Sequence, residues 1–249
     1  MSTLSVAPAR AGTGTYTVSI AHTAGQIRAA QRLRYDVFAG EFGARLHGDT
    51  IDADEFDEVC DHLIVRYNPT GQVVGTYRLL PPGRNPRLYS DGEFDLSALD
   101  DLRPWLVEAG RSCVHPDFRG GEIVNLMWSA LARYMLLAGH RYLAGCASVP
   151  LADGGHAATS TWQLAERRHA GPRELRARPL RPWLPESDED TRPSYASVPP
   201  LLRGYLRLGA RVCGPPAHDP DFGVADFFVL LRMDQVNERY LRFFLGQDR

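Results

Sequence analysis

The chain has 249 residues, of which 44% are apolar and 23% are charged, a composition typical of one soluble globular domain. Its formal net charge of −2 argues against a general affinity for nucleic acid. All 28 basic residues are arginine, which excludes chemistry that depends on a lysine amine, such as a Schiff base or a P-loop. The four cysteines lie far apart without metal-ligand spacing, so we expect reduced thiols and neither a metal site nor a bound cofactor.

Residues 1–13 are small and polar and have no apolar core, so we expect a disordered lead-in there and not a signal peptide. The periodicity of the remaining sequence predicts strands and helices in alternation. In chain order, the first half holds a strand at 16–20, a helix at 25–38, a hairpin of strands at 62–67 and 72–80 and a strand at 106–114. The second half holds a helix at 122–137, a strand at 142–149, a helix at 201–208, a strand at 225–233 and a helix at 236–245. This order indicates a single α/β (α+β) domain over 14–249 with one central mixed sheet. The proline-rich, charged stretch at about 150–200 is interpreted as an extended insertion.

The segment 114–121, with the sequence VHPDFRGG, connects a predicted strand to a predicted helix. The first turn of a helix has unpaired N–H groups that bind phosphate together with the helix dipole, and Gly120 and Gly121 allow an anion to approach closely. A plain strand-to-helix turn is the alternative. The segment resembles the acyl-CoA pyrophosphate loop of the GNAT superfamily, V-x-P-x-[FY]-R-G, but the sequence EIV at 122–124 replaces a further glycine, which favours a donor other than acetyl-CoA. The resemblance implies that the donor-binding residues are Cys113, Val114, Arg119, Gly120, Gly121, Glu122 and Ile123.

A second element of the same superfamily follows in the expected order. The sequence YLRLGA at 205–210 resembles Y-x-x-x-G-[FA], in which the tyrosine hydroxyl protonates the departing thiolate. An ordinary helical tyrosine is the alternative for Tyr205. Together the two motifs imply a GNAT fold, with a central, mixed and mostly antiparallel sheet flanked by helices.

Further motifs narrow the family. They are RYxVF at 34–38, EFDxxCDHL at 55–63, VGTYRLL at 74–80, EFDL at 93–96, ExGRSCVHP at 108–116, GCAS at 145–148 and PPLLxGYLRLGA at 199–210. Together they resemble the ornithine Nα-acyltransferases of ornithine-lipid synthesis (hemolysin-like), and the same framework is similar to acyl-homoserine-lactone synthases. Both families use acyl groups on acyl carrier protein and attack the thioester with the α-amine of a small amino-acid derivative. The resemblance therefore specifies the reaction class better than the acceptor.

The resemblance implies a bacterial enzyme that transfers a long-chain fatty acyl group, with or without a 3-hydroxyl, to the α-amine of ornithine or a similar amino acid. The donor is a thioester of acyl carrier protein or CoA, used as a co-substrate. Lactone synthesis and acylation from CoA by another kind of GNAT enzyme are alternatives, and a non-catalytic module that binds acyl thioesters is an alternative of a different class. We expect a cytoplasmic location, with a peripheral contact at the inner face of the membrane because the product is a lipid precursor.

The α-amine of an amino acid is mostly protonated at neutral pH, so the reaction needs a general base. Related synthases use a glutamate on the strand before the phosphate loop, and this implies the same role for Glu108. An ion pair with Arg78 or Arg111 is the alternative. His115 is a further candidate for proton transfer, although its position beside a proline suits a loop-shaping role. Backbone N–H groups at 113–115 are expected to stabilise the thioester oxygen.

Acidic and basic residues of the shared pattern are candidates for binding the acceptor. Asp57 and Asp61 are expected to bind a cationic amine, and a solvated acidic loop is the alternative. Arg34, Arg78 and Arg111 are expected to hold the acceptor's carboxylate, because a guanidinium group binds carboxylates through two parallel hydrogen bonds. Pairing with the aspartates is the alternative role for these arginines.

A block of arginines stands in the predicted insertion. A basic face of this kind could dock the acidic acyl carrier protein or attract anionic lipid headgroups, and a solvated charged loop is the alternative. The block consists of Arg167, Arg168, Arg173, Arg176, Arg178 and Arg181.

Overall fold

The computed structural model describes residues 14–41, 43–44, 46, 50–185 and 193–246, so the lead-in predicted at 1–13 lies outside the described residues. The strands are β1 (Tyr16–Ile20), β2 (Asp61–Tyr67), β3 (Val73–Leu80), β4 (Phe94–Asp95), β5 (Leu106–Val114), β6 (Tyr142–Pro150), β7 (Arg178–Pro179), β8 (Arg211–Val212), β9 (Ala217–Asp219) and β10 (Val224–Arg232). The helices are α1 (Ala24–Phe38), α2 (Glu122–Leu137), α3 (His156–Leu164), α4 (Pro200–Leu208) and α5 (Glu238–Leu245). The long elements therefore lie where the sequence pattern predicts them.

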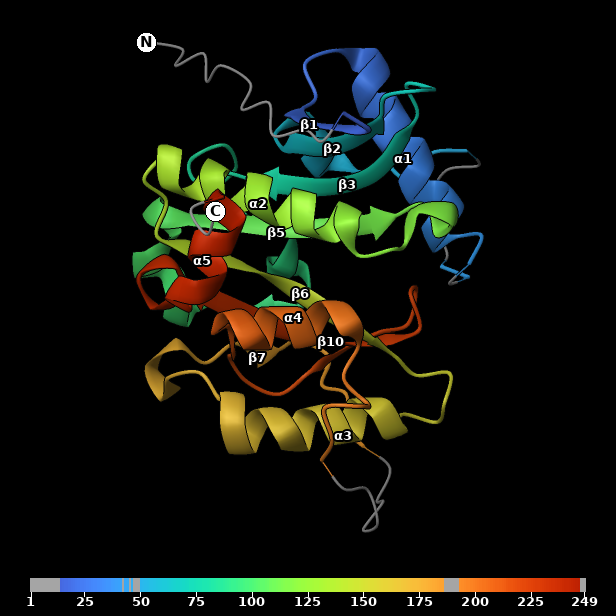
Figure 1. Cartoon of the computed structure of the whole chain (residues 1–249). Helices are drawn as coiled ribbons and strands as arrows, with labels where there is room; N and C mark the ends of the chain where they lie inside the picture. The colour runs from blue at the N-terminus through green and yellow to red at the C-terminus, as the bar shows by residue number, and fades with distance from the viewer. Residues whose placement is uncertain (1–13, 42, 45, 47–49, 186–192, 247–249) are drawn as a thin grey trace.

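One eight-stranded sheet organises the chain (Figure 1). Its strand order is β1-β2-β3-β5-β6-β10-β8, and β9 pairs with β10 beside this path. All neighbouring strands are antiparallel except β5 and β6, which are parallel. The predicted mixed, mostly antiparallel sheet flanked by helices is confirmed.

The parallel pair β5 and β6 is joined over a short length. The paired residues run only from Leu106 opposite Tyr142 to Glu108 opposite Ala144, although each strand has nine residues. Immediately beyond them the strands are still close, because a Cβ added at Gly145 would lie 2.2 Å from the carbonyl oxygen of Ala109. The strands then part, and their separation leaves room within the sheet for a ligand.

A bulge in β5 lies at the same place. The register between β3 and β5 shifts so that Arg111 and Ser112 both stand opposite Tyr77. Arg111 has a φ of 51°, a left-handed conformation that is uncommon for a residue with a side chain. Bulges bend a strand, re-aim its side chains and interrupt the hydrogen-bond ladder, and they occur often beside active sites.

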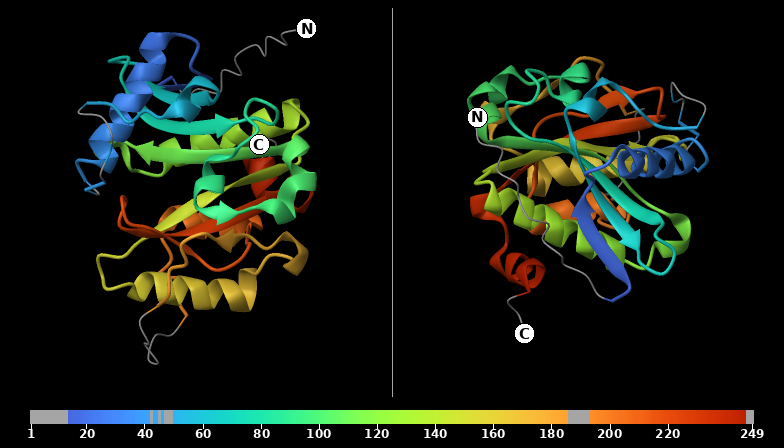
Figure 2. Two further views of the ribbon diagram at one scale, coloured as in Figure 1. Left: turned by 180° about the vertical axis from the view of Figure 1, so that it is seen from behind. Right: turned by 90° about the horizontal axis from the view of Figure 1, so that it is seen from above.

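Helices cover both faces of the sheet. α1 packs on one face through Ala30, Leu33 and Val37, and α2 packs on the other through Ile123 and Met127. Figure 2 (right) shows α1 and α2 on opposite sides of β3. The segment between β3 and β5 covers the α1 face farther along, over β5, β6 and β10 (Figure 2, left).

The stretch at about 150–200, where the sequence indicates only a short arginine-rich, helix-like segment, contains a helix that was not predicted. α3 and the turn after it bury Ala158, Leu164 and Ala165 in the same core as Phe227 of β10. Much of this stretch is therefore folded onto the sheet. Residues 186–192 lie outside the described part of the chain. Within the described part, no helix combines the length and apolar character that a membrane span requires.

Candidate active site

A pocket of about 1100 Å³ opens at the C-terminal end of β5, beyond the residues of β5 that pair with β6. Val37 and Phe38 of α1 line it from one face of the sheet, and Trp128 of α2 and Phe244 of α5 line it from the other. Residues 112–114 of β5 form the wall between them. The pocket therefore reaches both faces of the sheet, so two substrates that enter from opposite sides can meet at β5.

The predicted phosphate loop forms one rim of this pocket. Gly121 has a φ of 83° and directly precedes α2, whose first intrahelical acceptor is the Gly121 carbonyl, 3.1 Å from the N–H of Asn125. A Cβ added at Gly120 or Gly121 would meet nothing within 4 Å, so the space above the helix N-terminus is open. Arg119 lies across the end of β5, where it donates to the carbonyl of Val114 and forms an ion pair with Glu41 at 2.8 Å. The loop thus combines a helix N-terminus with a nearby cation, as an anion site requires.

Within this rim His115 shapes the loop. Its side-chain Nδ1 accepts a hydrogen bond from the backbone N–H of Asp117 at 3.3 Å, and the backbone N–H of His115 donates to the carbonyl of Val74 at 2.9 Å. The His115 N–H, one of the groups that we expected to stabilise the thioester oxygen, is therefore engaged within the sheet. The backbone at the bulge of Arg111 and Ser112, where the hydrogen-bond ladder is interrupted, is better placed to stabilise that oxygen.

Tyr205 stands on α4 and faces β3. Its hydroxyl forms a hydrogen bond with the hydroxyl of Tyr77, and its ring packs against Trp128 at a centroid distance of 5.7 Å. A Cβ at Gly204 would lie 2.0 Å from the Trp128 ring, so this glycine allows α4 to approach α2 closely. The packing orients Tyr205 toward the sheet beside the pocket.

On the α1 face, two predicted acceptor-binding arginines form a buried ion network. Arg34 is fully buried, and it donates to Asp52 and to Asp57 at 2.7 Å each. Arg78 donates to Asp57 at 2.8 Å and also to Asp54. Burial acts to raise the pKa of Asp57, but the two guanidinium groups and a hydrogen bond from Gln31 hold it well below its usual range. Asp57 therefore connects α1 to β3, with both of its oxygens engaged inside the protein.

Arg111 differs from these two arginines. Its contacts with Asp52 and Asp54 are longer, at 3.3 and 3.4 Å, and its side chain is 14% exposed, against 0% and 4% for the other two. Its guanidinium group stacks over the rings of Tyr89 and Phe222, at 4.8 and 5.0 Å from the ring centroids. Arg111 is thus the arginine of this group that is best placed to receive a carboxylate.

Glu108 points to the α1 face and is 5% exposed. Its carboxylate accepts hydrogen bonds from the N–H of Tyr89 at 2.6 Å, from the N–H of Ser90 at 2.8 Å and from the Ser90 hydroxyl at 2.6 Å. Burial raises the pKa of Glu108, and the hydrogen bonds from Ser90 oppose that rise. The carboxylate therefore fixes the turn at 89–90, and its pKa is shifted in the direction that favours a general base.

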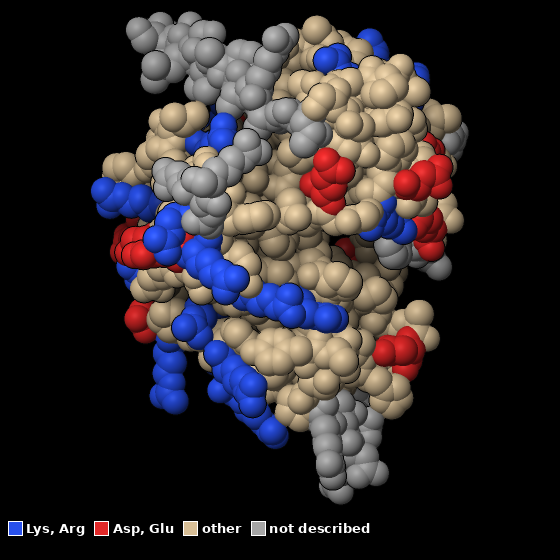
Figure 3. All heavy atoms as spheres, viewed as in Figure 1, with Lys and Arg blue, Asp and Glu red and all other residues tan. Residues whose placement is uncertain are grey.

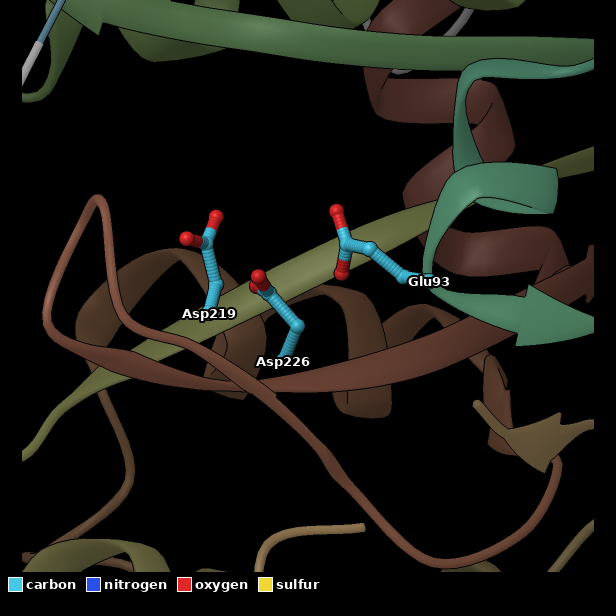
Figure 4. Close-up of side chains that lie close together, drawn as sticks. All are labelled: Glu93, Asp219 and Asp226. Atoms are coloured by element: carbon cyan, nitrogen blue, oxygen red, sulfur yellow. The ribbon is translucent and has the colours of Figure 1, made fainter. Parts of the chain in front are cut away.

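Three carboxylates, those of Glu93, Asp219 and Asp226, gather on the same face (Figure 4). Their ligand oxygens lie within 4.8 Å of one another, and the hydroxyl of Ser148 donates to Asp226 at 2.6 Å. Burial, and then the charge of Asp226, raises the pKa of Glu93 to about 9, while burial raises the pKa of Asp226 to about 6. At neutral pH this acidic cluster holds a proton that an entering cation would replace. The cluster could hold a metal ion or an ammonium group.

The structure separates other predicted residues from this site. Asp61 accepts a hydrogen bond from the Tyr134 hydroxyl of α2 at 2.8 Å, on the face opposite to Asp57. Among the described residues that line the pocket, the arginines are Arg119, Arg207 and Arg239, and none belongs to the block at 167–181.

Sequence reasoning missed the acidic cluster and Tyr77. Glu93 and Tyr77 both lie in the quoted motifs EFDL and VGTYRLL, but the motifs alone gave them no role. Asp219 and Asp226 lie on a short hairpin, and nothing in their spacing indicates that they meet Glu93.

Comparison with known proteins identifies the family. The chain is 35% identical to an L-ornithine N(alpha)-acyltransferase of Brucella abortus over 93% of this chain and 89% of that protein. It belongs to the L-ornithine N(alpha)-acyltransferase family. A relative of the same name from Rhodobacter capsulatus is also 35% identical, over 92% of this chain and 94% of that protein. The family model described as an acetyltransferase (GNAT) domain matches residues 33–129.

The solved structures agree with this fold. A CoA-dependent acyl-homoserine lactone synthase, BjaI, with SAM and isopentyl-CoA, aligns with a TM-score of 0.55 at 17% identity, over 90% of this chain and 82% of that one. The GNAT fold and the family expected from the motifs are thereby confirmed, and this acyltransferase acts on an amine. The roles of individual site residues in this N-acyltransferase remain predictions.

The acidic cluster makes the stability of the acyltransferase dependent on pH. Because the pKa of Glu93 is raised in the folded state, to about 9, folding is favoured while this group is protonated and becomes less favourable as the pH rises toward that value. Glu93→Gln, which cannot ionise, should therefore lose less stability than the wild type between about pH 5 and about pH 9. We expect a difference of about 1 kcal/mol or more, since one unit of pKa shift corresponds to about 1.4 kcal/mol.

Urea unfolding at both pH values measures this difference. Asp234→Asn, which changes an exposed carboxylate on the surface, is the control and should follow the wild type. Parallel loss of stability in Glu93→Gln and the wild type would contradict a buried proton at this cluster.

Proposed function

We propose that this acyltransferase transfers a long-chain fatty acyl group from a carrier-bound thioester to the α-amine of ornithine, releasing the carrier thiol. The observation that carries the proposal is the cleft itself. An apolar pocket beside the predicted phosphate loop opens at the end of β5, and Val37 and Phe38 line it on the α1 face, the face to which Arg111 and the acidic cluster also belong. The names of the relatives support ornithine as the acceptor.

The donor fits the helical side of the cleft. The phosphate of a CoA or carrier-protein pantetheine arm would lie at the N-terminus of α2, and the fatty chain would pass between Trp128, Phe244 and the neighbouring apolar side chains. Figure 3 shows arginine side chains gathered over α4 and α5, and Arg119, Arg207 and Arg239 also line the pocket. These guanidinium groups would attract the phosphates of CoA or the acidic surface of acyl carrier protein. We therefore place donor docking here, and not at the arginine block 167–181.

The acceptor fits the α1 face. Ornithine has one carboxylate and two ammonium groups near neutral pH, so its site needs one cation and nearby carboxylates. Arg111 would receive the carboxylate, and the acidic cluster of Glu93, Asp219 and Asp226 would receive the side-chain ammonium in exchange for its proton. Asp57, which we had expected in this role from the sequence, already neutralises two arginines.

The chemistry would take place at the bulge. Glu108, directly or through water, would remove a proton from the ammonium so that the α-amine can attack the thioester carbonyl. Backbone N–H groups at the interrupted ladder would stabilise the oxyanion, and Tyr205 would protonate the thiolate as the C–S bond breaks. The product is an N-acyl ornithine, which has the amphipathic character of a lipid precursor.

The activity is tested with a mixed panel of donors and amines. Purified enzyme is incubated with palmitoyl and acetyl thioesters of CoA and of acyl carrier protein, together with ornithine, lysine, norvaline and S-adenosylmethionine. Mass spectrometry should detect palmitoyl-ornithine as the main product. Equal rates with acetyl and palmitoyl donors, or a lactone product from S-adenosylmethionine, would contradict the proposal.

The phosphate loop is tested by Gly120→Val. The added side chain meets nothing in the protein within 4 Å of its Cβ, so the fold should be unaffected, but it would occupy the space above the helix N-terminus. We expect the donor KM to rise about tenfold, equivalent to about 1.4 kcal/mol, while the KM for ornithine stays nearly constant. Gly14→Val, also at a position with nothing within 4 Å of the added Cβ and away from the residues that line the pocket, is the matched control. A change confined to the ornithine KM would place the donor elsewhere.

The acceptor site is tested by comparing two aspartates. Asp226→Asn should weaken ornithine binding by about 1–3 kcal/mol, because it removes a charged partner of the side-chain ammonium. Norvaline, which has no side-chain amine, should be much less sensitive. Asp61→Asn distinguishes this acceptor site from the one expected from the sequence, because it should weaken ornithine binding only if Asp61 binds the acceptor's amine. Equal weakening of ornithine and norvaline by Asp226→Asn would remove the acidic cluster from acceptor recognition.

The base is tested through the pH profile. The raised pKa of Glu108 predicts an acidic limb in kcat/KM, and Glu108→Gln should abolish that limb and lower the rate by about 100-fold. Ser90→Ala removes a hydrogen bond that lowers the pKa of Glu108, so it should move the limb to higher pH while the plateau changes little. A Glu108→Gln variant that keeps both rate and limb would assign Glu108 to the turn at 89–90 alone.

A further inference from the structure

Three hydroxyl groups form a connected line beside the cleft. Ser112 stands at the bulge of β5, opposite Tyr77 of β3, and lines the pocket. The hydroxyl of Tyr77 is hydrogen-bonded to that of Tyr205 on α4, and the Ser112 side chain is the polar neighbour that favours ionisation of Tyr77 from the β5 side. The line therefore runs from β5 through β3 to α4, and it joins Ser112, which lines the pocket, to Tyr205, whose neighbour Gly204 lines the pocket, through one residue that is in the core.

Tyr77 is an unusual residue to find at the centre of this line. Its side chain is 3% exposed and lies in the core that α2 covers, among Val107, Ile123 and Met127. A tyrosine hydroxyl in such surroundings is expected to have hydrogen-bond partners, and here its polar neighbours are hydroxyl groups. Burial also raises the pKa of Tyr77, so this hydroxyl keeps its proton except during transfer. Because a hydroxyl donates one hydrogen bond and accepts others, each member can receive a proton as it passes its own on.

The two ends of the line correspond to the two ends of the reaction. Ser112 follows Arg111, the residue that we assign to the acceptor carboxylate, so it lies at the acceptor end. Tyr205 is the acid assigned to the departing thiolate, and it packs between Trp128 and Tyr77. A Tyr205 that has given up its proton in this half-buried position needs a nearby donor, and Tyr77 is in contact with it.

We propose that Ser112, Tyr77 and Tyr205 form a proton relay that carries the proton of the attacking amine to the sulfur of the leaving thiol. The inference rests on the proposed function. Tyr77 is a positioning residue that acts through Tyr205 and does not touch either substrate.

The relay balances the reaction. Attack of the neutral amine forms the C–N bond and leaves an excess proton on nitrogen. Ser112 accepts this proton and passes its own to Tyr77, Tyr77 passes its proton to Tyr205, and Tyr205 protonates the sulfur as the C–S bond breaks. Each hydroxyl ends with one proton, so no further acid, base or co-reactant is consumed. The proton removed earlier from the ammonium by the general base is a separate one.

The relay predicts a dependence on the leaving group that a structural role does not. An alkyl thiol of the pantetheine type must be protonated as it leaves, whereas a nitrothiophenol leaves as a stable thiolate. We therefore compare palmitoyl-CoA with the palmitoyl thioester of nitrothiophenol, using ornithine as acceptor. Tyr77→Phe and Tyr205→Phe should each lower kcat for palmitoyl-CoA by about 100-fold, the usual contribution of a positioned acid. With the aryl donor both should retain the wild-type kcat within about threefold.

Ser112→Ala provides an independent variant that does not alter the core around Tyr77, and it should show the same preference for the aryl donor. Tyr195→Phe is the matched control, because it removes a hydroxyl bonded to His169 outside the cleft, and both donors should be unaffected. Thermal unfolding of each variant establishes that it is folded. A Tyr77→Phe enzyme that is slowed equally with both donors, or with neither, overturns the relay, as does a Ser112→Ala enzyme without any donor preference. A wild-type enzyme that fails to acylate ornithine with either donor overturns the proposed function instead.

Discussion

Strands β5 and β6 are held together by only three residue pairs, and the architecture of the cleft depends on where that pairing stops. Gly145 follows the last residue of β6 that pairs with β5. Because it has no side chain, its backbone can lie close to the carbonyl group of Ala109 in β5. Beyond it, backbone groups that a continuous sheet would pair lose their partners, and such groups are costly to leave buried without a substitute. The thioester donor that we propose, with carbonyl and amide groups along its arm, would supply that substitute. The parted strands thus leave space for a ligand, and they also leave backbone groups with which a polar, extended ligand can pair.

The separation of the two faces follows from the same geometry. Side chains alternate across a strand, so at the bulge adjacent residues of β5 face different surroundings, with Arg111 on the α1 face and Ser112 on the pocket side. The buried arginines behind Arg111 need carboxylates because an unpaired buried charge is very unfavourable. Asp52, Asp54 and Asp57 supply them, and they hold α1 and the preceding loop against β3. Charged residues that the sequence suggests as ligands of the acceptor therefore form ion pairs that hold the surrounding structure in place.

The sequence predicted the long strands and helices, the fold and the family, because these depend on periodicity and on many short motifs that agree in order. It did not predict α3, whose sequence HAATSTWQL has few large apolar residues, nor the short strands β4, β7, β8 and β9, which are too short to show a period. The site was harder. Asp57 and Asp61 are close in sequence, but β2 begins at Asp61, and the two carboxylates lie on opposite faces of the sheet. The left-handed backbone conformation at Arg111 cannot be predicted from the sequence, because the residue there is not a glycine. The proximity of Glu93 to Asp219 and Asp226 depends on contacts between segments that are distant in the sequence.

The use of arginine alone for every basic residue has a consequence for an enzyme of this kind. An acyl thioester is an electrophile, and a lysine at the mouth of the pocket could compete with the substrate and become acylated itself. A guanidinium group stays protonated in proteins and is a poor nucleophile. Arg119, Arg207 and Arg239 can therefore offer positive charge around the pocket and remain chemically inert toward its contents. No lysine side chain of this protein competes with the acceptor for the activated acyl group.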